Sequence, residues 1–388
     1  MIFTETRTKG YGSHFGSSLL SIFLLCSAAA NANDSEYFTS GNQLVPLSET
    51  DISIRKEILT IGLQDDKFAN VTVYYELFNP GTTDKTVLMG FEADPSYNDD
   101  YVFHPDGKHP HIHDFTVEMN GEKLSYQNAV CQQGTPDGLQ PIDMSKYEVC
   151  EETVTTVHPI GNDTLFIPFS YVYYFQATFK PGLNKIRHTY KYTQSRGVGF
   201  AFKIDYKLTP ATRWANHQID DFTLVVRADH TAKHFLIDEE LFDMAPWRLT
   251  EGEGKQRVTP HPGRSLREFS LRNGAYTWHK TNFCPKSELS ITSADEIYLF
   301  NERATFGAFY DRSSSLELNF GKERTNNRMK EDLRKRIAHN LPYAHRGHVF
   351  NDRVLDDYFS TLWWYIPNPD YKDDQSDFTE IDKQFLAY

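Results

Sequence analysis

The sequence predicts a mainly β protein, in which two antiparallel, Ig-like β-sandwich units at residues 33–165 and 166–322 precede a small α-helical domain at residues 323–388. Two observations lead to this prediction. Short segments of alternating apolar and polar residues, separated by turn residues, fill the chain from about residue 50 to residue 320, and helical periodicity begins only near residue 326. The boundary between the β-units follows Gly161-Asn162-Asp163, which interrupts the alternation.

The alternation is clearest where a segment ends in turn-forming residues. Residues 71–77 run into Asn79-Pro80-Gly81, and residues 115–119 run into Asn120-Gly121, a strong hairpin signal. The turn Pro181-Gly182 joins two further alternating segments, which gives a second strand–turn–strand pattern. We expect other strands at residues 200–208, 222–228, 276–281, 297–300 and 316–320.

The first 32 residues have the pattern of a signal peptide. Arg7 and Lys9 precede a mostly apolar run at residues 19–30, and Ala30-Asn31-Ala32 offers a small-residue cleavage site. The run is too short to cross a bilayer as a stable helix, and nothing later in the chain approaches the length of a membrane span. We therefore expect export to the periplasm or the extracellular space.

The charge of the chain limits its partners. The formal net charge is −13 at pH 7, and no basic stripe accompanies it. Nucleic acid and anionic lipid are therefore not expected as partners. The sequence offers no sign of a bound cofactor.

Three cysteines follow the signal peptide, at Cys131, Cys150 and Cys284. In an oxidising compartment two of them are expected to pair. The pair Cys131 and Cys150 closes the shortest loop, and such a disulfide would contribute about 3 kcal/mol by restricting the unfolded chain. The other two pairings remain open.

The C-terminal domain begins with a helix predicted at residues 326–340. Met329, Leu333 and Ile337 form a narrow apolar stripe on it. Pro342 is expected to end or kink this helix, and Gly347 suits a left-handed turn.

A second short helix is expected after that turn. Asn351 is the expected N-cap, and Leu355, Tyr358 and Phe359 lie on one side. Trp363-Trp364-Tyr365 follow, before Pro367. With few other apolar residues, the core of this domain must consist largely of aromatic side chains.

Tyr343-Ala344-His345-Arg346-Gly347, together with the aromatic residues after it, resembles the YARHG domain, a small extracytoplasmic bacterial module. The family motif reads Tyr-Ala-Arg-His-Gly, so its third and fourth letters are exchanged here. The resemblance implies an appendage of an envelope protein without a known catalytic role. The candidate binding residues of this module are Tyr343, Arg346, Trp363, Trp364 and Tyr365. For Arg346, stacking on an aromatic ring or pairing with Asp356 or Asp357 is the preferred alternative to ligand recognition.

A weaker resemblance covers the β region. Phe115-Thr-Val, Phe179-Lys-Pro-Gly, Tyr206-Lys-Leu-Thr-Pro210, Trp214 and Phe222-Thr-Leu-Val-Val follow one another as in an uncharacterised family of secreted bacterial β-proteins. This similarity implies architecture and no activity.

Three histidines form the sharpest candidate for chemistry. His109, His111 and His113 alternate, so on a strand they would present three imidazoles on one side, with Asp106 or Asp114 as an oxygen donor for zinc. The competing interpretation is a polar loop, favoured by Pro110, that leads into a strand. The isolated carboxylates Glu57 and Glu151-Glu152 are expected at solvated edges.

The aromatic content, 14%, allows two interpretations. Clusters such as Tyr171, Tyr173, Tyr174 and Phe175, or Trp363-Trp364-Tyr365, form either a packed core or flat platforms that stack on sugar rings. No nucleophile elbow or other catalytic motif accompanies them.

The first functional hypothesis is therefore an exported envelope protein with a non-catalytic binding or assembly role. Its ligand would be a glycan, a peptidoglycan component or another envelope protein. The alternative is a metal-dependent hydrolase that uses His109, His111 and His113.

Overall fold

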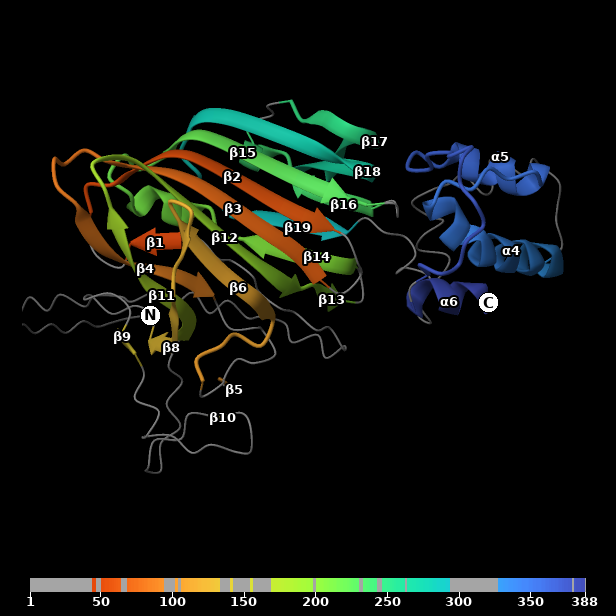
Figure 1. Cartoon of the computed structure of the whole chain (residues 1–388). Coiled ribbons are helices and arrows are strands. Elements are labelled where there is room, and N and C mark those ends of the chain that lie inside the picture. Colours follow the sequence, from red (N-terminus) through yellow and green to blue (C-terminus); the bar gives the residue numbers. More distant parts are fainter. Residues whose placement is uncertain are drawn as a thin grey trace, which may run out of the picture. The chain divides into compact units, whose positions relative to one another are not determined.

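Figure 1 shows the computed structural model of the chain. The described residues are 44–46, 50–63, 68–93, 102–103, 106–132, 140–141, 154–155, 169–197, 200–229, 233–242, 246–261, 264–293, 327–378 and 380–387. The signal peptide, Glu151-Glu152, the predicted interruption at residues 161–163 and the predicted strands at 297–300 and 316–320 lie outside them.

The described chain consists of strands up to residue 293 and of helices from residue 327, which confirms the mainly β prediction. The strands together are called the β body below. They are β1 (Leu44–Pro46), β2 (Ser53–Leu63), β3 (Phe68–Asn79), β4 (Lys85–Ala93), β5 (Val102–Phe103), β6 (Ile112–Met119), β7 (Glu122–Lys123), β8 (Gln127–Gln132), β9 (Gln140–Pro141), β10 (Val154–Thr155), β11 (Phe169–Phe179), β12 (Gly182–Thr193), β13 (Ser195–Gly197), β14 (Phe200–Tyr206), β15 (Ile219–Ala228), β16 (Lys233–Asp238), β17 (Arg248–His261), β18 (Arg264–Phe283) and β19 (Leu289–Ser293). Two 3-10 helices, η3 (Thr209–Arg213) and η4 (Glu240–Phe242), connect some of them.

Two large sheets form the β body. One has five strands in the order β1-β4-β11-β8-β9, and the other has twelve, in the order β13-β14-β19-β16-β18-β15-β2-β3-β12-β6-β7 with β17 paired to β18. In the larger sheet β2 and β15 run parallel. Along one edge of β18 its first half pairs with β16 and its second half with β15, while β17 follows the other edge.

Two turns carry the chain from one sheet to the other. β3 and β12 belong to the large sheet, whereas β4 and β11 belong to the smaller one. The predicted turn at Pro181-Gly182 is therefore a corner between sheets and not a hairpin. Buried Asn79 donates to the Phe179 carbonyl at 3.0 Å, and buried Asn184 donates to the Lys180 carbonyl at 2.8 Å, so both corners keep their backbone groups bonded.

The hairpin predicted at Asn120-Gly121 is confirmed. It joins β6 to β7, and its two residues have φ of 53° and 89°. Positive φ at both central positions is what a tight hairpin turn requires.

Aromatic side chains fill the space between the sheets. Phe91 of β4 lies 4.8 Å from Phe115 of β6 and 5.0 Å from Tyr190 of β12, measured between ring centroids. Tyr173 of β11 lies 4.9 Å from Phe115. Of the aromatic cluster at 171–175 only Tyr174 is half-buried, and its hydroxyl donates to Gln127 at 2.7 Å. This cluster is therefore core, with one ring turned outward.

The boundary predicted near residue 165 does not separate two sheets. β11 pairs with β4 and β8, and β12 pairs with β3 and β6, so strands from both sides of residue 165 share both large sheets. Local alternation identifies strands but not their partners, which is why the sequence pattern could not place this boundary.

Candidate binding site in the C-terminal module

Three helices make up the C-terminal module: α4 (Asn327–His345), α5 (Arg353–Thr361) and α6 (Glu380–Leu386). Pro342 lies inside the last turn of α4, so it does not end the helix, which was one of the two outcomes predicted for it. Gly347 ends the helix, with a φ of 83°. The Gly347 N–H donates to the Ala344 carbonyl at 2.9 Å, and the His348 N–H donates to the Tyr343 carbonyl at 3.0 Å. These two bonds form a Schellman motif, which satisfies the last carbonyls of the helix.

Helix α5 starts one residue later than predicted. Its N-cap is Asp352 and not Asn351, because the Asp352 carboxylate accepts from the backbone N–H groups of Val354 at 3.0 Å and Leu355 at 3.1 Å. The predicted apolar side is confirmed, since Leu355, Tyr358 and Phe359 are all buried. Among the described residues no helix is long and apolar enough to cross a membrane.

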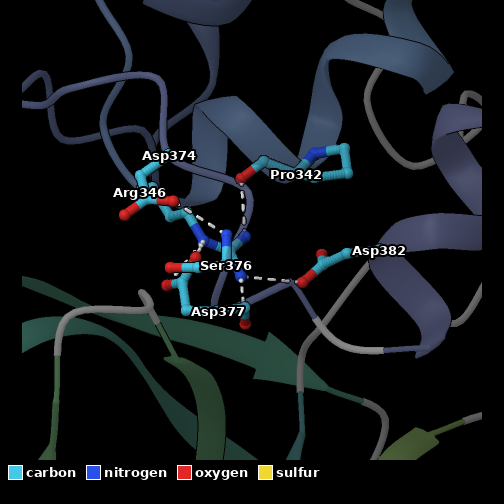
Figure 2. Close-up of polar contacts among 6 residues, drawn as sticks. All are labelled: Pro342, Arg346, Asp374, Ser376, Asp377 and Asp382. Carbon is cyan, nitrogen blue, oxygen red and sulfur yellow. Dashed lines mark hydrogen bonds and ion pairs between the residues drawn. The ribbon is translucent and has the colours of Figure 1, made fainter.

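Arg346 lies at the centre of the module (Figure 2), and its side chain is only 2% exposed. Its Nη1 donates to the Pro342 carbonyl at 2.9 Å, and its Nη2 donates to Asp382 at 2.8 Å. Its Nε donates to Asp377 at 3.1 Å, and its guanidinium carbon lies 4.2 Å from the ring centroid of Phe378. Burial by itself lowers the pKa of Arg346, but the Asp382 and Asp377 carboxylates outweigh burial and raise it.

This network joins the end of α4 to the chain before α6 and to α6 itself. Arg346 thus pairs with carboxylates and stacks on an aromatic ring, as the preferred alternative stated, although the partners are Asp377, Asp382 and Phe378 instead of Asp356 or Asp357. A guanidinium surrounded in this way has no face open to a ligand.

The aromatic segment after α5 contacts the β body through its main chain. Three successive carbonyls accept hydrogen bonds from side chains of β17 and β18. Trp364 O accepts from Ser270 Oγ at 2.9 Å, Tyr365 O from Lys255 Nζ at 2.8 Å, and Ile366 O from Arg272 Nη1 at 2.7 Å, so residues 364–366 are called the docking segment. Arg272 is 1% exposed and also pairs with Glu253.

Two buried imidazoles meet beside the docking segment. His234 of β16 and His345 of α4 stack with centroids 4.9 Å apart, and the Trp364 ring lies 4.7 Å from each of them. Trp363, which is half-buried, covers the Arg257 guanidinium at 4.4 Å. The module and the β body therefore meet through ring stacking, cation–π contact and hydrogen bonds.

Comparison with protein families finds two matches. Residues 314–388 match the model of the YARHG domain. The C-terminal module is a YARHG domain. Residues 32–146 match a domain of unknown function, DUF4424. A search of curated proteins finds no match.

Solved structures resemble the chain only distantly. A Legionella pneumophila protein, provisionally described as nutrient binding, is 19% identical with a TM-score of 0.47, over 92% of this chain and 98% of that one. An M1 zinc metallopeptidase from Deinococcus radiodurans is 11% identical with a TM-score of 0.24, over 63% of this chain and 43% of the peptidase. An aminopeptidase N family protein from Idiomarina loihiensis is 9% identical with a TM-score of 0.21, over 61% and 29%. The chain thus spans less than half the length of either peptidase.

The predicted binding residues of the YARHG domain mostly face their own chain. Trp364 and Tyr365 are 2% and 3% exposed, and the Tyr365 hydroxyl donates to the His348 carbonyl at 2.5 Å. Tyr343 is half-buried, its hydroxyl accepts from Gln375, and its ring meets Phe378 at 5.3 Å. The structure brings these residues together as a packing and docking unit.

The three candidate metal ligands do not converge. β6 begins only at Ile112, so His109 and His111 precede it in a turn and strand alternation cannot align them with His113. The buried His109 accepts the His111 N–H on its Nδ1 at 3.0 Å, whereas His113 Nε2 lies 3.0 Å from Thr193 Oγ1. In the described part of the chain, no three His, Cys, Asp or Glu side chains form a metal-binding group.

The cysteine prediction is only partly visible. Cys131 on β8 carries a free, buried thiol, and Cys150 lies outside the described residues. The Cys131–Cys150 pair therefore stays a prediction. Burial, with the nearby Glu92 carboxylate, raises the pKa of the Cys131 thiol to about 11, so this thiol is a poor nucleophile. Cys284 is exposed.

The sequence analysis was wrong about one buried polar residue of the β body and did not consider another. Glu57, expected at a solvated edge, is fully buried, and the Tyr206 hydroxyl donates to its carboxylate at 3.5 Å. A register shift between Ile54 and Lys56 turns Glu57 inward. The signal was present: on β2 the apolar residues change from even positions, such as Ile54, to odd ones, such as Leu59.

His188 of β12 is the second. It is fully buried between aromatic rings, with Phe91 at 5.3 Å and Tyr190 stacked at 6.2 Å. Neither ring nitrogen has a hydrogen-bond partner in the described structure. Burial lowers the pKa of His188 to about 3, so the ring is neutral in the native protein at physiological pH.

Proposed function

We propose that the protein is an exported bacterial envelope protein with a non-catalytic binding or assembly role. The observation that supports this best is the joining of the YARHG domain to β17 and β18 through the docking segment. It unites a small helical domain and a large sheet into one ordered body. Such a body suits capture of a partner on its outer surface better than chemistry at a solvent-shielded centre.

The proposed ligand is a component of the bacterial envelope, either a glycan, such as a peptidoglycan strand, or another envelope protein. Export through the signal sequence at residues 1–32 would bring the chain to such ligands. Because the YARHG residues Arg346, Trp364 and Tyr365 are already engaged within the chain, the ligand would meet other surfaces.

A sedimentation experiment tests this function. The purified chain is incubated with isolated peptidoglycan sacculi and, separately, with immobilised envelope proteins from a Gram-negative bacterium, and the retained fraction is measured against chain concentration. We expect saturable retention by one of the two, without release of soluble fragments from the sacculi. Retention by neither, or steady release of fragments, would contradict the proposed role.

Two variants extend that experiment: Arg257→Ala is the test and Arg353→Ala is its matched control. Arg257 lies under Trp363 at the contact between the YARHG domain and the β body, whereas the Arg353 side chain is 92% exposed on α5. If the joined body is what binds, Arg257→Ala reduces retention and Arg353→Ala does not.

A further inference from the structure

One row of outward-facing side chains, five threonines and one valine, crosses six strands of the large sheet. Cross-strand pairing aligns Thr116 of β6 with Thr189 of β12, Thr189 with Thr72 of β3, and Thr72 with Thr60 of β2. Thr60 then pairs with Val225 of β15, and Val225 pairs with Thr277 of β18. The threonine row consists of Thr116, Thr189, Thr72, Thr60, Val225 and Thr277, so a valine on β15 interrupts its hydroxyls.

The threonine row lies on the face opposite the core. Each member is half-buried and stands between two buried neighbours on its own strand, for example Thr72 between Val71 and Val73. Figure 1 shows β15, β2, β3 and β12 side by side in this sheet. With strands about 4.8 Å apart, the row extends roughly 24 Å across the sheet.

Hydrogen bonds order the hydroxyls at both ends of the row. Thr116 Oγ1 lies 2.7 Å from Thr189 Oγ1, and Thr277 Oγ1 lies 3.0 Å from Thr250 Oγ1 of β17. A hydroxyl has one donor and two acceptor sites, so a threonine in such a pair can still bond a ligand.

The charges beside the row are matched in pairs. On one side Glu118 stands directly opposite Arg187. On the other side Lys191 pairs with Asp114 at 2.8 Å, and Arg227 pairs with Glu251. The strip is thus close to neutral in a chain whose net charge is −13, which disfavours an anionic ligand.

An aromatic ring borders the middle of the row. Tyr74 is two positions from Thr72 on β3, on the same face, and is half-buried. Its hydroxyl donates to Glu76 at 2.8 Å, and Ile58 of β2 is its cross-strand partner. The flat apolar face of a sugar ring packs well on such a pair, while its hydroxyls bond the neighbouring threonines.

We propose that the threonine row binds a neutral, linear, extended glycan that lies across the strands, with Tyr74 as its stacking partner. This inference rests on the proposed binding function and names the ligand class and the surface. A neutral strip, hydroxyls on five of the six strands and a length that suits several sugar units all fit a polyhydroxylated chain without carboxylate or phosphate groups.

The test is a calorimetric titration of the purified chain with two probes, chitohexaose and cellohexaose. The variant Thr60→Val/Thr72→Val/Thr189→Val removes three hydroxyls and keeps the shape and strand preference of each side chain. The control Thr86→Val/Thr178→Val removes a hydroxyl pair, 2.9 Å apart, from β4 and β11 of the other sheet. The variant Thr60→Ser/Thr72→Ser/Thr189→Ser keeps the hydroxyls.

We expect saturable binding of at least one probe, an increase in Kd of about tenfold or more for the triple valine variant, and little change for the control or the serine variant. Circular dichroism and the melting temperature confirm that each variant is folded. Binding that survives the triple valine substitution, or a chain that binds neither probe, overturns the inference. Retention on envelope fractions that is unaffected by the valine variant would leave the proposed function intact and refute the threonine row alone.

Discussion

Most of the described ion pairs of the β body are exposed on the sheet surface, whereas the YARHG domain has a buried one. Lys191 and Asp114 of the β body are 50% and 69% exposed, and Arg346 and Asp382 of the YARHG domain are 2% and 6% exposed. The β body is held mainly by a large apolar core, although it also buries charged groups such as Glu57 and Arg272. The YARHG domain has few apolar residues, so a fully bonded guanidinium joins its segments.

The two regions also differ in the hydrogen bonding of a buried, nitrogen-containing side chain. His188 lies in the apolar core of the β body without a hydrogen-bond partner in the described structure, while Arg346 donates to a carbonyl and two carboxylates. The first arrangement lowers stability and depends on pH, and the second orders the chain. Arg346 of the YARHG motif is thus bonded within its own domain.

Removal of the central guanidinium should have the largest effect. Arg346→Leu removes the buried guanidinium that pairs with Asp377 and Asp382, so the free energy of unfolding of the YARHG domain should fall by about 3–5 kcal/mol. The change in the free energy of unfolding is measured by urea unfolding, monitored through hydrogen exchange of the backbone amides in α4 and α6. Arg353→Leu, at an exposed pair on α5, is the control. Equal effects of the two substitutions would contradict the structural role.

Acid should destabilise the β body through His188. Its pKa is about 3 in the native protein and about 6.5 when unfolded, so between these values the unfolded chain binds more protons and stability falls as pH falls. The loss should reach about 3 kcal/mol between pH 7 and pH 4.

The variant His188→Phe tests that contribution. It should flatten the acid dependence of stability, because the replacement ring cannot be protonated and fits among the neighbouring aromatic rings. His279→Gln on β18, where the histidine is 54% exposed, serves as the control. An unchanged pH slope in His188→Phe would show that His188 does not remain neutral in the native state.

A smaller effect is expected at the contact between the two regions. Gly347 has a φ of 83°, and a Cβ there would lie 2.6 Å from the Ile366 carbonyl oxygen and against the Arg272 guanidinium. Gly347→Ala should therefore cost about 1–2 kcal/mol for the backbone alone, and more for the contact. Gly121→Ala isolates the backbone part, because Gly121 has a φ of 89° and open space around it. Similar melting temperatures for both variants would argue against tight docking.

Much of the fold could be predicted because strand and helix signals are local. The hairpin at Asn120-Gly121 and the left-handed Gly347 each depend on a few neighbouring residues. The interleaving of β11 and β12 with strands before residue 165 depends on long-range pairing, which a local pattern does not specify. The threonine row is hidden for the same reason, since its members become neighbours only through strand register.

For the candidate site, the sequence predicted the kind of interaction that Arg346 makes but not the residues with which it makes it. Arg346 was expected to pair with a carboxylate, but Asp377 and Asp382 come from the segment before α6 and from α6 itself, a helix that the sequence analysis did not anticipate. For the aromatic segment at residues 363–365, the sequence left a packed core and a ligand-binding platform both open. Docking on Ser270, Lys255 and Arg272 depends on side chains about one hundred residues earlier in the chain.

The most direct measurement is hydroxyl-radical footprinting of the purified chain, with oxidation of individual tryptophan and tyrosine side chains read by mass spectrometry. If the motif is used within the chain, Trp364 and Tyr365 react slowly without ligand, and Arg272→Ala speeds their oxidation while buried Trp278 of the β body is unaffected. Fast oxidation of Trp364 and Tyr365 in the free chain, with protection only when an envelope fraction is added, would contradict the account.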